Sequence, residues 1–254
     1  MVADAPQTLA HWLQALLLNA VLIAAASRAP LLTSRGWVHA AALGTILWGC
    51  LGAAGWLAVV AYLVLGSLVT RLGFARKQQQ GLAEARGGRR GPENVWGSAA
   101  TGALLALLIT LLGPAARPVL LVGFVASFAA KLADTCGSEI GKRWGRHTVL
   151  ISSLRPVPPG TEGAISLEGT AASLAGGLLM TLIAAGLGLV PAQLPLLALL
   201  TAVALIATLI ESLIGATWQQ RCSWLSNELV NGLQTAIAAL LAMALMLPAF
   251  LAGP

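Results

Sequence analysis

The stretch 119–140, VLLVGFVASFAAKLADTCGSEI, decides how this sequence folds. It carries no charge up to Ala130, and then Lys131, Asp134 and Glu139 follow within the same run. A transmembrane helix needs about 20 mostly apolar residues, because lipid offers the backbone no hydrogen-bond partner. The stretch has that length. It therefore predicts a membrane-spanning helix whose second half carries charged side chains.

The composition of the whole chain agrees with this interpretation. Of 254 residues, 57% are hydrophobic and 9% are charged, and the mean hydropathy is +0.83. Soluble domains usually carry about 25% charged residues, so lipid must surround most of this chain. The apolar runs lack the alternation of barrel strands, and the three separated cysteines form no zinc or disulfide pattern. The fold class that we expect is an all-α polytopic transmembrane bundle without a soluble domain.

Apolar runs recur along the chain, and together they predict about seven or eight spans in a single integral-membrane domain covering 1–254. The stretch 37–69 is too long for one ordinary pass, and Gly49, Gly52 and Gly55 indicate a turn within it. Polar loops are expected at 70–94 and 141–163. The expected spans are Leu9–Ala26, Trp37–Cys50, Leu51–Val69, Val95–Leu112, Val119–Ile140, Ala164–Leu189, Leu194–Ala216 and Glu228–Phe250.

The basic residues indicate an orientation. Eight spans put both termini on one side of the membrane and the loops 27–36, 70–94, 141–163 and 217–227 on the other. These four loops contain every lysine and arginine of the chain except Arg117 and Lys131. Because positive charge stays on the cytoplasmic side, the four loops are predicted to face the cytoplasm or the stroma.

The acidic residues need a different explanation. Asp134, Glu139, Glu168, Glu211 and Glu228 lie within the expected spans or at their ends, where a charge costs about 2.5–3.5 kcal/mol. Asp134 can pair with Lys131 one turn earlier, a helix N-terminus can favour Glu228, and Glu168 and Glu211 can reach the interface. Since all five lie at a similar depth beside the basic loops, we favour a shared polar cavity.

Carboxylate and carboxamide oxygens are ligands that Mg²⁺ prefers, and arginine and lysine bind phosphate. A metal on phosphate oxygens beside cationic donors is what phosphoryl transfer requires. The segment GSEIGKR at 137–143 lacks the spacing of a Walker A loop. We therefore predict a Mg²⁺-dependent site for phosphate compounds that binds the nucleotide without that loop.

Several blocks of the sequence resemble one known family. The strings RRGPENVWGSAATG (89–102), ADTCGSEIGK (133–142), GTEGAISLEGT (160–170), ESLIGA (211–216) and NELVNGLQT (227–235) are similar to those of the integral-membrane family that contains plant and cyanobacterial phytyl-phosphate kinases. The resemblance implies a kinase that converts phytyl phosphate to phytyl diphosphate for tocopherol and phylloquinone synthesis, in a cyanobacterial or plastid membrane. Distantly similar phytol and dolichol kinases use CTP, so CTP is the favoured donor, with ATP or UTP as alternatives.

The residue types suggest which side chains bind the metal, which bind the nucleotide and phosphates, and which act in catalysis. The predicted metal ligands are Asp134, Glu139, Glu211 and Glu228. The predicted nucleotide and phosphate contacts are Arg89, Arg90, Asn94, Lys142, Arg143, Asn227 and Asn231. The predicted catalytic group around the acceptor comprises Lys131, Asp134, Glu162 and Glu168.

Two other functions fit the same charges. Intramembrane carboxylates also occur in transporters and proton-coupled carriers. A CTP-dependent cytidylyltransferase of a lipid phosphate would use a similar Mg²⁺–nucleotide site. The expected partners are the bilayer, a prenyl phosphate and a nucleoside triphosphate. No nucleic acid is expected, and oligomer formation is compatible with the sequence.

Overall fold

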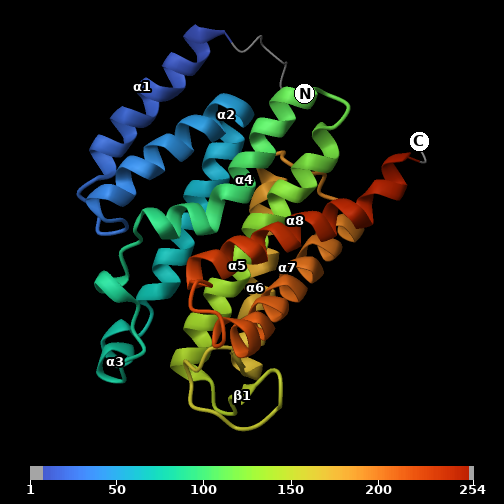
Figure 1. Cartoon of the computed structure of the whole chain (residues 1–254). Coiled ribbons are helices and arrows are strands. Elements are labelled where there is room, and N and C mark those ends of the chain that lie inside the picture. Colours follow the sequence, from blue (N-terminus) through green and yellow to red (C-terminus); the bar gives the residue numbers. More distant parts are fainter. Residues whose placement is uncertain (1–7, 252–254) are drawn as a thin grey trace.

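The computed structural model describes residues 8–251, and in this range the protein is a helical bundle with one short strand pair (Figure 1). Seven of the helices described are long and apolar enough to cross a membrane, which confirms the expected fold class. The short elements are η1 (Ala85–Gly88), a π-helical turn η2 (Gly215–Gln219), and strands β1 (Val149–Leu150) and β2 (Ala164–Ile165). The helices are α1 (Leu9–Ala26), α2 (Ser34–Arg71), α3 (Phe74–Gln79), α4 (Pro92–Leu112), α5 (Arg117–Trp144), α6 (Leu167–Gly186), α7 (Leu194–Ile214) and α8 (Asn227–Leu251).

Local sequence signals start these helices. The hydroxyl oxygens of Thr8, Thr33 and Ser166 accept hydrogen bonds from backbone N–H groups in the first turns of α1, α2 and α6. Such caps satisfy donors that have no partner inside the helix. Helices α4, α5 and α7 instead have proline in their first turn, where its missing N–H costs nothing.

The expected break between residues 37 and 69 is confirmed. Helix α2 extends over 38 residues, but Gly52 leaves the helical conformation with φ 64° and ψ −156°. Side chains rarely adopt this φ, so glycine is the residue suited to the position. Figure 1 shows the chain turning back sharply there, which divides α2 into two halves. The two expected spans are therefore halves of one interrupted helix.

Helix α5 lies at the centre of the bundle and packs against α2, α4, α6, α7 and α8. Its side chains are buried from Leu120 to Cys136. Glycine permits its close approach to α6, since a Cβ placed on Gly169 would lie 2.9 Å from the carbonyl oxygen of Gly137. The central position brings the charged half of α5 next to most of the other long helices.

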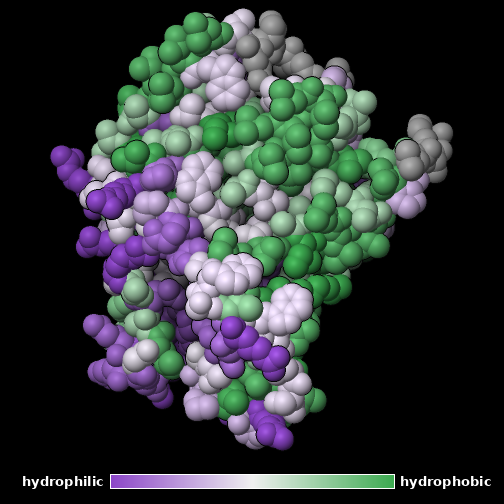
Figure 2. Space-filling view, in the orientation of Figure 1, coloured by the Kyte–Doolittle hydropathy of each residue, from purple (hydrophilic) through white to green (hydrophobic). Residues whose placement is uncertain are grey.

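Hydrophilic residues gather along the left side and at the lower end of the molecule in Figure 2, where Figure 1 shows the loops 72–91 and 145–166. The second loop contains an antiparallel strand pair with Val149 opposite Ile165 and Leu150 opposite Ala164. This pairing corrects one expected boundary. The span expected from Ala164 begins at Leu167, because Ala164 and Ile165 belong to the strand and Ser166 caps the helix.

Candidate active site

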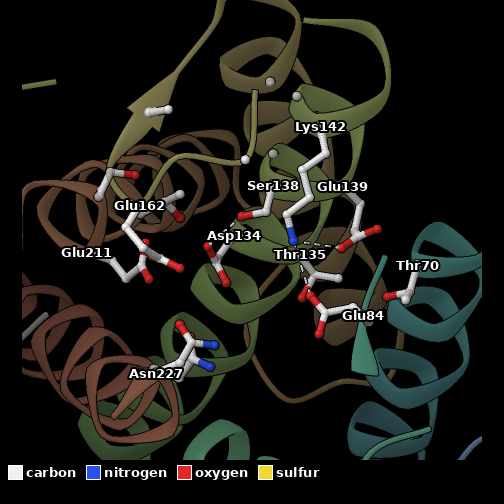
Figure 3. A pocket seen from close by; sticks show the side chains of 18 of the residues that line it. Thr70, Glu84, Asp134, Thr135, Ser138, Glu139, Lys142, Glu162, Glu211 and Asn227 are labelled. Atoms are coloured by element: carbon white, nitrogen blue, oxygen red, sulfur yellow. Dashed lines mark hydrogen bonds and ion pairs between the residues drawn. The ribbon is translucent and has the colours of Figure 1, made fainter. Parts of the chain in front are cut away.

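A cavity of about 440 Å³ lies at the polar end of the bundle. Its lining comes from α2, α4, α5, α6, α7 and α8 and from the loops 72–91 and 145–166. Side chains from these elements point into one space in Figure 3. Residues far apart in the sequence, such as Thr70 on α2 and Asn227 on α8, therefore line the same site.

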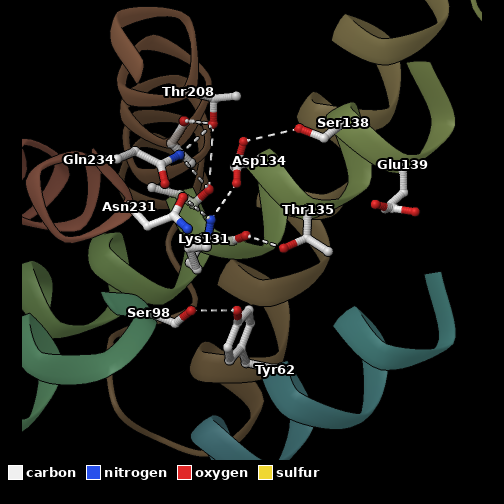
Figure 4. A network of polar contacts seen from close by, with 12 residues as sticks. Tyr62, Ser98, Lys131, Asp134, Thr135, Ser138, Glu139, Thr208, Asn231 and Gln234 are labelled. Carbon is white, nitrogen blue, oxygen red and sulfur yellow. Dashed lines mark hydrogen bonds and ion pairs between the residues drawn. The ribbon is translucent and has the colours of Figure 1, made fainter. Parts of the chain in front are cut away.

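A buried ion pair on α5 lies at the inner part of this cavity (Figure 4). Lys131 and Asp134 form an ion pair one turn apart, and Lys131 also donates a hydrogen bond of 2.7 Å to Asn231 on α8. Ser138 donates to the other carboxylate oxygen of Asp134 at 3.3 Å. The expected pairing of Asp134 with Lys131 is thus present, and both residues still line the cavity. Pairing lowers the cost of burying the two charges and keeps them available at the site.

Uncharged polar side chains hold the helices together next to this pair. The amide nitrogen of the fully buried Gln234 donates to Thr208 on α7 and to the carbonyl oxygen of Ala130 on α5, both at 3.1 Å (Figure 4). The pattern of charged residues in the sequence did not indicate that Gln234 and Thr208 lie beside the site. Helical spacing in α8 would have indicated Gln234, because Asn227, Asn231 and Gln234 recur on one face.

Two further carboxylates face Asp134 from outside α5. Glu211 on α7 and Glu162 on the loop 145–166 point toward the same space as Asp134 (Figure 3). Glu162 is open to the cavity, yet nearby protein atoms desolvate its carboxyl and raise its pKa above the ordinary value of 4.5. The charge of Lys142 acts in the opposite direction. An excess of negative charge on this side of the cavity favours a cation or a cationic complex.

Glu139 is placed differently from these acids. Its carboxylate forms an ion pair with Lys77, whose side chain is fully buried and also donates to the carbonyl oxygen of Thr70 at 2.7 Å. Lys142 lies 3.5 Å from the same carboxylate and 3.2 Å from Glu84. The sequence did not predict a site role for Lys77 or Glu84. Lys77 stands between the exposed Arg76 and Gln78, so no local pattern distinguishes it.

Three arginines of the loop 72–91, Arg86, Arg89 and Arg90, also line the cavity. Arg86 forms an ion pair with Glu93 at 2.5 Å, and both side chains are exposed. The guanidinium of Arg90 lies 5.0 Å from the centre of the Tyr62 ring and donates to the Tyr62 hydroxyl. Asn94 connects this part to α8 by a 3.4 Å hydrogen bond from its amide to Glu228.

The structure brings most of the predicted site residues together and corrects the placement of two. Arg143 and Glu168 do not line the cavity. The guanidinium carbon of Arg143 lies 4.8 Å from the centre of the Trp144 ring. Glu168, in the first turn of α6, accepts a hydrogen bond from the backbone N–H of Arg146. The predicted residues that line the cavity are Arg89, Arg90, Asn94, Lys131, Asp134, Glu139, Lys142, Glu162, Glu211, Asn227, Glu228 and Asn231.

The four predicted metal ligands do not form one cluster. Within residues 8–251, no group of three or more His, Cys, Asp or Glu side chains is arranged to hold a metal by itself. Glu139 is paired with lysines, and Glu228 accepts a hydrogen bond from the amide of Asn94. The predicted set Asp134, Glu139, Glu211 and Glu228 stays a prediction, and the carboxylates that the structure places around one space are Asp134, Glu162 and Glu211.

Fold and site together define a class: a polytopic membrane protein whose charged cavity is formed at one end of its helical bundle. The chain belongs to the integral membrane protein family DUF92, whose model matches residues 17–239. This match confirms the family resemblance that the sequence blocks indicated.

Relatives of known sequence come from cyanobacteria, plants and archaea. The chain is 50% identical to an uncharacterized membrane protein of Synechocystis sp., over 91% of this chain and 90% of that protein. It is 41% identical to Protein VTE6, chloroplastic, of Arabidopsis thaliana, over 84% of this chain and 64% of that protein. It is 27% identical to an uncharacterized membrane protein of Methanocaldococcus jannaschii, over 95% of this chain and 97% of that protein. No solved structure matches the chain.

Proposed function

We propose that this protein is a membrane kinase that transfers a phosphoryl group from a nucleoside triphosphate, CTP in the first instance, to phytyl or a related prenyl monophosphate. The family resemblance and the similarity to Protein VTE6, chloroplastic, support a role in phytol salvage and in tocopherol and phylloquinone synthesis. One observation carries the proposal. Carboxylates and cationic side chains face a single cavity at the polar end of an apolar bundle.

The reaction needs little covalent help from the protein. An oxygen of the prenyl phosphate attacks the γ-phosphorus, the bond from that phosphorus to the β–γ bridging oxygen breaks, and the nucleoside diphosphate leaves with the bonding electrons. A phosphate monoester is already an anionic nucleophile, so no general base is required. The protein must align two anions and neutralise the charge between them.

The cavity residues fit this requirement. Lys142, Arg89 and Arg90 can bind phosphate oxygens, and Lys131 balances Asp134. Mg²⁺ usually binds one or two carboxylates together with substrate phosphates, so the pair Glu162 and Glu211 suits an ion that enters with the nucleotide. When bound there, it would neutralise charge on the phosphates. Asp134 then orients the ammonium of Lys131 toward the cavity.

The two alternative functions predict different features. A transporter needs a polar path through the bundle, whereas the large side chains of Phe124, Phe128 and Leu132 on α5 are fully buried in an apolar cluster. A cytidylyltransferase would use the same cavity and differs in its products. Product analysis therefore separates it from a kinase.

A label-transfer assay tests the proposal. Protein purified in detergent is incubated with Mg²⁺ and phytyl phosphate, and in turn with γ-labelled CTP, ATP and UTP. We expect label in phytyl diphosphate, with CTP the best donor. Label released as inorganic diphosphate would indicate cytidylyl transfer instead. If none of the three nucleotides labels phytyl, geranylgeranyl or farnesyl phosphate, the kinase proposal is wrong and transport into liposomes becomes the next assay.

The cavity and its basic loops would face the cytoplasm or the stroma, as the charge distribution predicts. The exposed residue Gln79 on α3 offers a labelling site. In a Cys222→Ala background, Gln79→Cys should react with a membrane-impermeant maleimide in inverted vesicles and remain unlabelled in right-side-out vesicles. The reverse pattern would contradict this orientation.

A further inference from the structure

We infer that the cavity contains an inner phosphate subsite, built by Arg90, Ser98 and Lys131, that takes the phosphate of the lipid acceptor. The nucleotide then occupies the outer part of the cavity around Lys142. This inference rests on the proposed function, and it divides between two substrates a site that the sequence treated as one. Three observations lead to it.

The first observation concerns which cavity cations already have a carboxylate partner. Lys142 contacts Glu84 and Glu139, and Arg86 is paired with Glu93. The guanidinium of Arg90 instead donates to the hydroxyl of Tyr62 and lies over its ring. Arg90 is half-buried and its charge has no carboxylate beside it. A half-buried cation without a carboxylate partner favours the binding of an anionic ligand.

The second observation is that Arg90 is held in place before any ligand arrives. Its backbone N–H donates to Leu31 and its carbonyl accepts from Thr33, both at 3.0 Å. Its guanidinium lies on the buried ring of Tyr62, and a Cβ placed on Gly66 would lie 2.6 Å from one of its nitrogens. A rigid arginine binds two phosphate oxygens with little loss of side-chain entropy.

The third observation is depth. The hydroxyl of Tyr62 donates to Ser98 at 3.1 Å and accepts a hydrogen bond from Arg90. Ser98 and Lys131 are buried within α4 and α5, with side chains that line the cavity. Lys142 and Glu84 lie at the end of α5 and in a loop. Arg90 belongs to the loop 72–91, but its guanidinium reaches Tyr62 and Gly66, which lie several residues before the end of α2 at Arg71. The Arg90 part of the cavity is thus the part toward the membrane.

The side from which each substrate enters indicates which part of the cavity it occupies. A prenyl phosphate enters from the bilayer with its tail in hydrocarbon, whereas a nucleotide enters from water. The inner subsite therefore receives the phosphate monoester, with Ser98 and the fixed guanidinium as donors and Lys131 as a second cation. Tyr62 does not touch the substrate in this arrangement, and it acts as a positioning residue for Arg90.

The test measures KM for each substrate separately. Arg90→Ala should raise KM for phytyl phosphate by about 10- to 100-fold, because it removes charge-assisted hydrogen bonds, and should leave KM for the nucleotide within about twofold. Tyr62→Phe and Gly66→Val should raise the same KM by less, since they displace the guanidinium without removing it. Arg155→Ala, on the exposed loop 145–166 outside the cavity lining, is the matched control. A rise confined to the nucleotide KM would overturn the inference.

A binding measurement separates this inference from the proposed function. Radiolabelled phytyl phosphate is titrated onto detergent-purified protein without any nucleotide, and Arg90→Lys serves if Arg90→Ala does not fold. Weaker binding in the Arg90 variant than in Arg155→Ala supports the subsite, even if the wild type transfers no label and the kinase proposal fails. If transfer succeeds while the Arg90 variant keeps wild-type binding and acceptor KM, the subsite is wrong and the kinase remains.

Discussion

The most apolar windows of helices α1 and α5 have the same mean hydropathy, but α1 lies at the edge of the bundle and α5 at its centre. The most apolar window of α5 is almost wholly buried, whereas that of α1 is mostly exposed. Within α1 only Ala15 and Asn19 are buried, and the helix packs on α2. A high mean hydropathy indicates that a helix is shielded from water. It does not indicate whether lipid or protein surrounds that helix. Four charged residues of the site, Lys131, Asp134, Glu139 and Lys142, lie on the helix that protein surrounds.

The largest effect expected from this comparison is on turnover. Asp134→Asn, on α5, should lower label transfer by about 10²–10³-fold, because it removes a charge that orients Lys131 at the cavity. Glu168→Gln, in the first turn of α6, should change it little, because Glu168 does not line the cavity. Rates are compared for variants with equal size-exclusion profiles. Comparable losses in both variants would contradict the placement of the site around α5.

The next effect concerns stability. Glu139→Gln leaves the fully buried ammonium of Lys77 without its carboxylate, and unpairing a buried charge costs about 3–5 kcal/mol. Thermal unfolding in detergent should show a large fall in Tm. The control is Glu93→Gln, because the Arg86–Glu93 pair is exposed and such pairs contribute about 0–1 kcal/mol.

A double variant sharpens the test. Adding Lys77→Met to Glu139→Gln removes the unpaired charge and should restore much of the lost Tm. Equal melting of the Glu139 and Glu93 variants would show that Lys77 finds another partner or reaches water.

The fold and much of the site were predictable from the sequence because lipid imposes simple rules. Long apolar runs must be helices, and Lys131 and Asp134 are visible as charges in such a run. Lys77 was not predictable, since burial depends on how α3 folds back onto α5. Arg143 was misplaced because it is one residue from Lys142, and neighbours on a helix point in different directions. Glu168 does not line the cavity, and its carboxylate instead accepts a hydrogen bond from the backbone N–H of Arg146.

A smaller effect is expected at the edge of the bundle. Asn19 on α1 accepts a 2.8 Å hydrogen bond from the indole of Trp56 on α2 and donates to Ala15. Asn19→Leu should lower stability by about 1 kcal/mol, a typical value for one hydrogen bond between membrane helices. It should leave label transfer at the wild-type rate. A loss of turnover at equal folding would show that α1 influences the site and would weaken the contrast with α5.

The smallest effect on stability is expected from Glu162, which faces α5 from a loop. Burial raises the pKa of its carboxyl in the folded protein, so ionising it is harder there than in the unfolded chain. Its contribution to stability is therefore greatest below pH 4.5 and is lost as the pH rises through the raised pKa. Glu162→Gln should melt slightly higher than the wild type at pH 8 and no higher near pH 4, with the difference kept small by solvent screening.

Activity should change in the opposite direction. If the ionised Glu162 carboxylate helps to hold the nucleotide's metal, wild-type label transfer falls as the pH is lowered through that raised pKa. The Glu162→Gln variant should be less active at pH 8 and should lack this acidic limb. A variant that is both more stable at pH 8 and fully active would mean that Glu162 only lines the cavity, and that the acids acting on the substrate come from the helices alone.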